Sequence, residues 1–450
     1  MLDTTIFSRI RAATCRFAGA NQGNFAVMFA VAAVPLISFV GAAIDYTRAN
    51  AARSAMQAAL DSTALMLGKD LTDGTITTSQ ISTKATAYFN ALYTNKDAKS
   101  VAVSATYTAA AGSGSTILLS GSGSVTTDFM KIAGFPSLGF STNSTSAWGN
   151  VRMRVAMALD NTGSMAQDGK IGALQTAAKS LIDQLSALAK TTGDVYISII
   201  PFAKDVNVGA SNYNQYWVDF TTWDTINGKC SNNTYKKQST CQANGKTWTP
   251  ANHNTWNGCV WDRDKDSTNP GFDTLNTAPT ASNVNTLFPA EQWSACPIAL
   301  MPLSYNWTNL KALIDTMTPN GNTNQAIGMA WAWQSLAQTA PLNAPAKDPA
   351  YTYKDAIILL SDGLNTQDRW YTDAASIDVR QSILCTNAKA ASVTVYTIQV
   401  NTSSPADPTS TVLQNCASSP DKFFMVTSAN QTLSVFNSIG TSLAKLRVAK

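Results

Sequence analysis

Residues 25–44 form an uncharged apolar run, and this run constrains the chain more than any other feature of the sequence. At about twenty residues, it is long enough to cross the hydrocarbon core of a bilayer as a helix. A membrane admits only helices and closed barrels, because their backbone hydrogen bonds are satisfied internally, and it tolerates a proline such as Pro35. We therefore expect a membrane helix, with most of the chain folding outside the membrane.

Arginines on either side of the run set its expected orientation. Arg9, Arg11 and Arg16 precede it, and Arg48 and Arg53 follow it. This shallow positive-inside bias favours a cytoplasmic amino terminus. We expect a single-pass protein, with residues 1–22 as a cytoplasmic leader and the bulk of the chain on the far side of the membrane.

A cleavable signal peptide is the alternative, because residues 41–43 (Gly-Ala-Ala) could serve as a small-residue cleavage site. A retained anchor is favoured for two reasons. The apolar run is long for a signal peptide, and an Ala-rich helical segment, 45–67, continues directly from it.

Cysteine usage agrees with export. Of the seven cysteines, only Cys15 precedes the membrane run, so an even number lies beyond it. This predicts disulfides in an oxidising compartment. Sequence proximity suggests the pairs Cys230–Cys241, Cys259–Cys296 and Cys385–Cys416. The alternative is zinc bound by Cys230, Cys241, His253 and Cys259, but the chain has no Cys-x-x-Cys pair to support it.

The carboxyl-terminal two thirds, 149–450, alternates between strand-like and helix-like segments, which is typical of a parallel sheet covered by helices. The segments are 151–159, 170–188, 194–202, 306–317, 324–337, 355–361, 376–391, 392–400, 409–417, 423–427 and 430–446. In the region before them, 69–148, we expect a helix at 80–94. Hydroxyl-rich strands at 101–119 and 125–147, broken at 112–114 and 121–123 by glycines, should form a small antiparallel sheet.

Oxygen-bearing side chains recur where these segments end. Asp160, Thr162 and Ser164 follow one predicted strand, Asp362 follows another, and Thr323 lies in a loop rich in glycine and asparagine. Loops at the carboxyl ends of parallel strands meet in one crevice, so these residues can converge. Hard divalent cations prefer oxygen ligands, which predicts a site for Mg²⁺, or for Mn²⁺ or Ca²⁺.

The pattern resembles the metal-ion-dependent adhesion site (MIDAS) of the von Willebrand factor A domain. That motif reads Asp-x-Ser-x-Ser, then a distant Thr and a distant Asp-Gly, and it falls here on Asp160, Thr162, Ser164, Thr323 and Asp362. Thr162 stands where Ser is usual, which keeps the hydroxyl and adds a methyl group. The resemblance implies an α/β, doubly wound, mostly parallel sheet. It also implies that the metal binds a carboxylate offered by a partner.

Two simpler interpretations compete with a metal site. Asp160 and Ser164 could merely cap the following helix, but this leaves Thr323 and Asp362 unexplained. A metal-dependent hydrolase would need a positioned general base. The only histidine, His253, lies in the insertion between the motif pieces, and no acid–base pair can be named, so we predict no enzymatic activity.

The membrane segment carries a second resemblance. Residues 23–30 (GNFAVMFA), the end of the apolar run at 43–46 (AIDY) and the Ala/Gln/Asp-rich stretch 51–65 resemble the amino-terminal region of TadG-like proteins of the tight-adherence (Flp) pilus assembly system. The resemblance covers residues 20–68 and extends loosely to 148, which implies a pilin-like α+β region. Met28 stands where pilin-like relatives carry Glu, which argues against cleavage after Gly23.

Residues 204–305 interrupt the α/β alternation and hold most of the outer cysteines. They also contain the exposed-looking tryptophans Trp217, Trp223, Trp248, Trp256, Trp261 and Trp293. This insertion is either a specificity element beside the metal or a small core of its own. Asp262, Asp264, Asp266 and Asp273 have the spacing of a calcium loop without its turn glycine, so a solvated acidic loop is the default.

Composition excludes some partners. The net charge is only +4, 13% of residues are charged, and no basic stripe appears, so nucleic acid is not expected. The two resemblances imply a pilus assembly or adhesion protein of the bacterial inner membrane, with the bulk of the chain in the periplasm or carried on to the cell surface. It would be built from a leader (1–22), an anchor (23–68), a small region (69–148) and a metal-binding domain (149–450). Its partner would be another pilus or secretion component. A surface adhesin for a host or abiotic ligand is the alternative.

Overall fold

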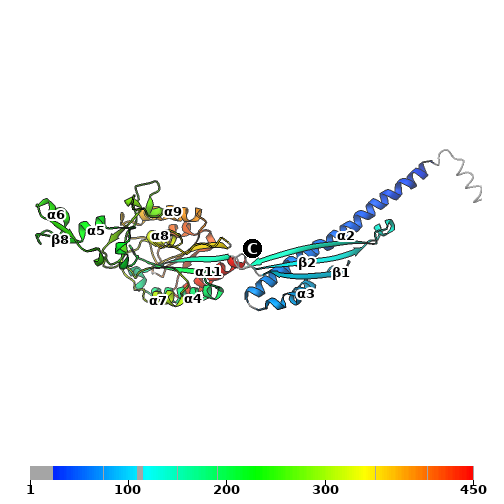
Figure 1. Cartoon of the computed structure of the whole chain (residues 1–450), viewed down its shortest axis with the longest axis horizontal. Coiled ribbons are helices and arrows are strands. Elements are labelled where there is room, and N and C mark those ends of the chain that lie inside the picture. Colours follow the sequence, from blue (N-terminus) through cyan, green and yellow to red (C-terminus); the bar gives the residue numbers. More distant parts are fainter. Residues whose placement is uncertain are drawn as a thin grey trace, which may run out of the picture. The chain divides into compact units, whose positions relative to one another are not determined.

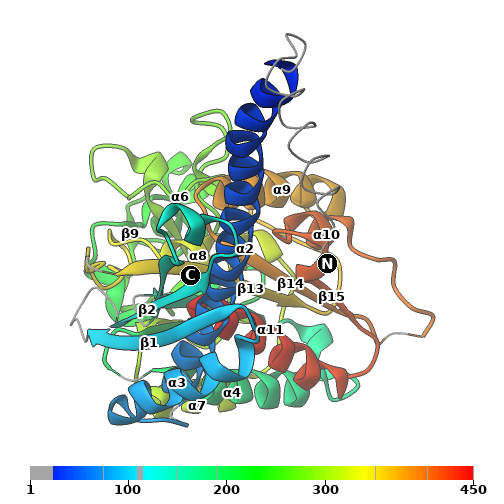
Figure 2. The same ribbon diagram turned by 90° about the vertical axis from the view of Figure 1, so that its right-hand side faces the viewer.

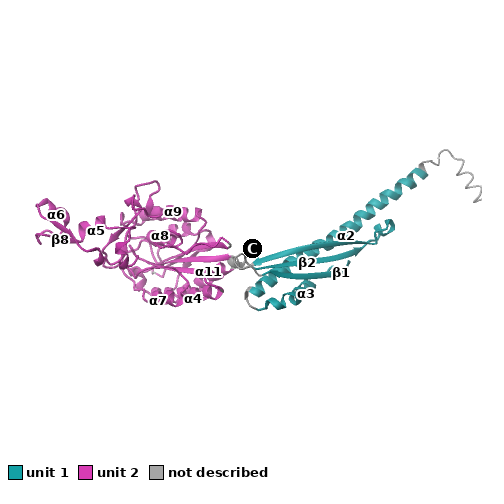
Figure 3. Cartoon of the chain, viewed as in Figure 1, with its two compact units in different colours: residues 1–148, 450 teal, residues 149–449 magenta. Residues whose placement is uncertain are grey.

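The computed structural model describes residues 24–448 except 74, 109–114, 149, 150, 190, 350 and 403. The predicted leader and Cys15 therefore lie outside the described residues. The chain divides into two compact units, residues 1–148 (with 450) and residues 149–449 (Figure 3). Each unit has a hydrophobic core of its own.

The first unit is organised on one long helix, α2 (Asn24–Asp73), of 50 residues (Figure 1). Among the described residues it is the one helix long and apolar enough to cross a membrane. Large apolar side chains of the predicted membrane segment are exposed, including Phe29 (68%) and Phe39 (77%), as lipid-facing side chains would be. Further along the same helix, Met56 and Leu60 are fully buried in the core of the unit.

Helix α3 and a three-stranded antiparallel sheet complete this unit, with β2 between the other two strands. The elements are α3 (Ile81–Leu92), β1 (Ala98–Thr108), β2 (Ser115–Thr126) and β3 (Ser137–Trp148). The predicted strand break at 121–123 is wrong, because β2 runs through it. Gly121 is needed there for close packing: a Cβ would lie 2.8 Å from the sulfur of Met56 on α2.

The second unit has a mostly parallel sheet, in which the strand order β15-β14-β13-β4-β5 reverses direction along the chain at β4. These five strands pair in parallel: β4 (Val151–Asp160), β5 (Val195–Phe202), β13 (Thr352–Ser361), β14 (Thr394–Val400) and β15 (Phe423–Val426). Parallel strands covered on both faces read as continuous apolar runs, and β4 is buried along almost its whole length.

Helices cover both faces of this sheet (Figure 2). One face packs against α4 (Lys170–Leu188), α7 (Trp307–Asp315) and α11 (Gln431–Val448). The other packs against α8 (Gln325–Ser335), α9 (Ala374–Ala390) and α10 (Thr411–Cys416). The predicted doubly wound, mostly parallel α/β fold is thus confirmed.

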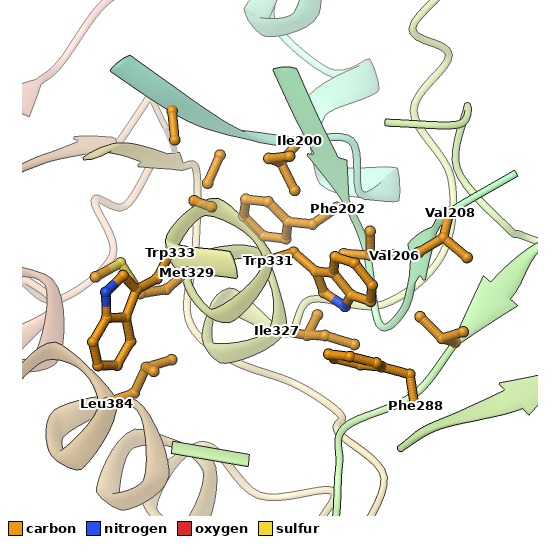
Figure 4. Close-up of a cluster of buried hydrophobic side chains, with 14 of the residues drawn as sticks. Ile200, Phe202, Val206, Val208, Phe288, Ile327, Met329, Trp331, Trp333 and Leu384 are labelled. Atoms are coloured by element: carbon orange, nitrogen blue, oxygen red, sulfur yellow. The ribbon is translucent and has the colours of Figure 1, made fainter. Parts of the chain in front are cut away.

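The insertion shares the core of the sheet domain. Trp331 of α8 lies beside Phe288 of the insertion, with 4.4 Å between ring centroids, whereas Trp333 points toward Leu384 of α9 (Figure 4). The sequence suggests exposed tryptophans, and for Trp217, Trp223, Trp248 and Trp256 this is wrong, because each is at most 8% exposed. These indoles are buried in the cores that hold the insertion together.

The insertion is built from short elements, of which some extend the far edge of the sheet through antiparallel pairings and one parallel pairing, while β8 and β9 form a separate two-stranded sheet. They are β6 (Val206–Asn207), β7 (Val218–Asp219), α5 (Thr221–Ile226), β8 (Gly228–Cys230), α6 (Gln238–Ala243), β9 (Trp248–Pro250), β10 (Cys259–Val260), β11 (Phe288–Glu291) and β12 (Met301–Ser304). Strand β12 pairs with β5 and returns the chain to the sheet domain.

Three disulfides are formed, and they join the pairs that sequence proximity predicts: Cys230–Cys241, Cys259–Cys296 and Cys385–Cys416. The zinc alternative fails, because the sulfurs it requires are bonded to one another. The Cys385–Cys416 bridge ties α9 to α10, so it staples two helices on one face of the sheet.

Replacing Cys385 and Cys416 together by alanine should destabilise the second unit by about 2–5 kcal/mol, the usual range for losing a native bridge. The reason is that the unfolded chain regains the freedom of a closed loop. Denaturant unfolding of the full chain measures this. An unchanged midpoint would show that helix packing alone fixes α9 and α10.

Candidate metal centre

The register of two neighbouring strands places the first two carboxylates. Leu159 of β4 lies opposite Leu360 of β13, so Asp160 and the pair Ser361 and Asp362 leave the same edge of the sheet together. The Ser361 hydroxyl donates to Asp160 Oδ2 at 2.6 Å. This edge is the carboxyl end of the parallel strands, where open α/β sheets bind ligands.

The turn after β4 adds the two hydroxyls. The backbone N–H of Thr162 donates to Asp160 Oδ1 at 2.9 Å, which folds the turn back over the strand end. The Thr162 and Ser164 hydroxyl oxygens are then 3.1 Å apart, and Ser164 donates to Asp362 Oδ1 at 2.6 Å. Four of the five predicted residues, from two separate segments, are therefore within hydrogen-bond reach in one chain of contacts.

Thr323 joins the group through its loop. On one side, the N–H of Gly163 donates to the carbonyl of Gly321 at 3.0 Å. On the other, the Thr323 N–H donates to the Thr366 hydroxyl at 2.8 Å, and its carbonyl accepts from the Thr366 N–H at 2.9 Å. Thr323 is 5% exposed, and its loop is held between the two segments that carry the other ligand candidates.

The two carboxylates are buried close to each other. Asp160 is 0% exposed and Asp362 is 3% exposed. Burial, and then the negative charge of Asp362, raise the pKa of Asp160 to about 7. Both effects disfavour the charged form, so the site gains most from a positive charge placed beside these oxygens.

Lys170 supplies such a charge, and sequence reasoning missed it. Its ammonium donates to Asp362 Oδ2 at 2.8 Å, and both side chains are almost completely buried. Lys170 is the first residue of α4, where the positive end of the helix dipole disfavours a cation. A lysine at that place was the available signal that a carboxylate lies nearby.

The donor set fits a hard divalent cation. All five candidate ligands are oxygens, and those of Asp160, Thr162, Ser164 and Asp362 are linked by the contacts above. Within the described residues no group of three or more His, Cys, Asp or Glu side chains could hold a metal, so the hydroxyls would be indispensable ligands. His253 lies elsewhere: it bonds to Asp224 at 2.8 Å in the insertion.

The acidic run of the insertion is not a single site, so neither the calcium loop nor a solvated acidic loop describes it. Asp262 accepts from the side-chain amide of Asn324 at 2.9 Å, next to Thr323. Asp273 instead pairs with Arg380 of α9. These carboxylates face separate partners and attach the insertion to the sheet domain.

The insertion also packs directly on the Thr323 loop. Gly321 has φ +82°, and a Cβ there would lie 2.3 Å from the Trp293 ring. The Lys204 ammonium lies over Trp293 and Trp261, 4.7 and 4.6 Å from the ring centroids, and donates to Glu291 at 2.7 Å. Part of the insertion therefore forms a wall beside the candidate metal ligands.

Because of Asp262, the stability of the folded chain depends on pH. Burial, and then the charges of Asp368 and Asp273, raise the pKa of Asp262 to about 7. The folded chain therefore keeps a proton that the unfolded chain releases from about pH 4 upward, so this residue's contribution to stability falls as pH rises from about 4 to about 7.

Asp262→Asn should remove this contribution, because the amide does not titrate. The free energy of unfolding of the variant, minus that of wild type, should therefore be higher at pH 8 than at pH 4 by up to about 4 kcal/mol. The measurement is denaturant unfolding of both proteins across that range. The exposed Asp266→Asn serves as the control. Parallel stability curves for wild type and Asp262→Asn would contradict the prediction.

Comparison with known proteins gives a family match for the amino-terminal segment of the chain. Residues 23–66 match the family model described as putative Flp pilus-assembly TadE/G-like. A search of curated proteins finds no match.

Among solved structures, similar chains include the vWF domain of the type V pili tip protein Mfa5 from Porphyromonas gingivalis (10% identity, TM-score 0.37, 66% of this chain and 97% of that one). The pilus adhesin SpaC from Lactobacillus rhamnosus GG also matches (10%, TM-score 0.38, 79% and 35%). A third is proximal thread matrix protein 1 from the mussel byssus with a zinc-occupied MIDAS motif (12%, TM-score 0.32, 66% and 46%). The chain thus spans less than half of the latter two proteins.

Proposed function

We propose that this chain is a membrane-anchored, extracytoplasmic component of a tight-adherence pilus system. In this proposal it docks a protein partner through a divalent cation, Mg²⁺ in the first instance. Asp160, Thr162, Ser164, Thr323 and Asp362 would hold the cation. The observation that carries the proposal is the convergence of two buried carboxylates and two hydroxyls at the carboxyl edge of the sheet. The TadE/G-like segment at residues 23–66 supports the pilus assignment.

Charge explains why such a site would bind an acidic partner. Asp160 and Asp362 carry two negative charges when ionised, and Lys170 returns one positive charge. A divalent cation bound there would supply an exchangeable position for an oxygen ligand. Together with Lys170 it would leave the buried site with one net positive charge. A carboxylate from another pilus or secretion component would neutralise that charge.

Location follows from the same residues. In the proposed arrangement α2 crosses the bacterial inner membrane, with the amino terminus in the cytoplasm. The second unit and the part of the first unit that follows the membrane segment then lie on the periplasmic side, where disulfides form. The three bridges beyond the membrane helix support this orientation.

Asp160→Asn tests the metal directly. The wild type should gain thermal stability as Mg²⁺ is added, by about 2.7 kcal/mol at a hundredfold excess over the dissociation constant. The variant should fold but gain nothing, because it lacks a charged oxygen ligand. Asp183→Asn, an exposed carboxylate with the same change of charge, should behave as wild type, and Thr162→Ser should keep the response.

Partner binding is tested in the same proteins. Detergent-solubilised wild-type chain should co-purify other pilus components from its own cells in Mg²⁺ but not in chelator, and Asp160→Asn should retain none in either buffer. Equal recovery in all four conditions, with the variant folded, would show that assembly uses another surface.

Lys170→Met tests the charge balance. Without metal the variant should lose about 3–5 kcal/mol, because removing one partner leaves a buried carboxylate unpaired. It should also bind Mg²⁺ more tightly, since the site then carries one more negative charge. Calorimetric titration and denaturant unfolding measure the two effects.

The matched control is Lys179→Met on the same helix, because Lys179 forms an exposed pair with Asp315. It should change stability by no more than about 1 kcal/mol. Weaker Mg²⁺ binding by Lys170→Met would mean that the lysine organises the ligands rather than offsetting their charge.

A further inference from the structure

The turn between β2 and β3 exposes large apolar side chains in a region that is otherwise rich in hydroxyls. It contains a short 3₁₀ helix, Met130–Ala133. The side chains of Phe129, Ile132 and Phe135 are 40%, 85% and 57% exposed. Exposed apolar clusters of this kind mark surfaces that contact a partner or a membrane.

This turn is fixed to the membrane helix. The carboxylate of Asp45, 1% exposed, accepts the backbone N–H groups of Asp128, Phe129 and Met130 at 3.0, 2.9 and 2.8 Å. Arg48 adds an ion pair to Asp128 at 2.7 Å. Two consecutive turns of α2 therefore determine where the apolar side chains lie.

The attachment point coincides with the end of the membrane segment. Asp45 is the first charged residue after the apolar run 25–44. The Phe129 ring lies against Gly41, inside that run, so close that a Cβ on residue 41 would approach it to 2.4 Å. Figure 1 shows the turn at the end of β2 lying beside α2. When residues 25–44 span a bilayer, this turn is held at the height of its surface.

We propose that residues 129–135 form a membrane-contacting wedge. Phe129, Ile132 and Phe135 enter the boundary between headgroups and acyl chains of the leaflet through which α2 emerges, and Lys131 contacts lipid phosphate. Aromatic and aliphatic side chains with a neighbouring lysine are the residue types that occupy this boundary. The wedge gives the first unit a second attachment to the lipid surface and fixes its height there. It is independent of the metal centre.

The occupant is lipid rather than a second protein because the wedge is continuous with the lipid-facing surface of α2. The exposed apolar side chains of α2 reach Val40 and Ile44, at the level of the turn. The polar groups beside the wedge are already paired with one another through Asp45, Arg48 and Asp128. What the turn offers outward is therefore apolar surface and one ammonium.

The test uses the full chain in vesicles of phosphatidylethanolamine and phosphatidylglycerol. Cys15→Ser removes the one cysteine outside the three disulfides, and Ile132→Cys then carries an environment-sensitive fluorophore under non-reducing conditions. Its emission should shift to the blue and be quenched by nitroxide lipids. Quenching should be stronger from a shallow acyl position than from a deep one, because interfacial segments sit about 5–10 Å into the boundary.

Leu118→Cys on β2 is the matched control, because Leu118 is also a partly exposed apolar residue (39%) of the same sheet. Its label should remain unquenched, whereas a label at Lys131→Cys should be quenched by the shallow lipid only. A label at residue 132 that behaves like the control would overturn the wedge. So would a blue-shifted but unquenched label that turns red when the protein is diluted into excess lipid, since another protein copy would then cover the turn.

Discussion

Two carboxylates forced together out of water are the constraint on which the second unit depends. The parallel register of β4 and β13 brings Asp160 and Asp362 to one buried edge, where their charges repel and hydration is lost. Neighbouring groups stabilise the two carboxylates: the Ser361 hydroxyl donates to Asp160, the Ser164 hydroxyl donates to Asp362, and Lys170 pairs with Asp362. The sheet register thus brings the two carboxylates together, and the turn after β4 and the start of α4 supply the groups that stabilise them.

The insertion depends on the same edge in a different way. It attaches to the Thr323 loop through Trp293 against Gly321 and through Asp262 bound to Asn324, and it packs Phe288 on Trp331 of α8. Its core and its contacts with the site are therefore continuous. The two interpretations of its tryptophans and disulfides, stability and recognition, do not compete, since the residues that hold the insertion together also position its wall.

The sequence predicts this architecture well where the signal is local. Apolar periodicity located the strands and helices of the sheet domain, and strand ends located Asp160 and Asp362. Contacts between segments that lie far apart in the chain could not be predicted from the sequence. Gly121 reads as a strand break in the sequence, whereas in the structure it lies within β2 and leaves room for Met56 of α2. In the sequence, Lys170 looks like an ordinary first residue of a helix. Its partner Asp362 lies 192 residues further along the chain, so the sequence does not show that the two side chains meet.

Strand β4 has a mechanical consequence. Strand β3 ends at Trp148 and β4 begins at Val151, so the chain passes from the anchored unit almost directly into this central strand. Asp160 stands at its other end. A partner pulling at Asp160 against the anchor would stretch β4 along its own axis, between parallel ladders to β13 and β5. Such a load runs along the covalent backbone of β4 and does not peel the ladder hydrogen bonds on either side of it apart one at a time.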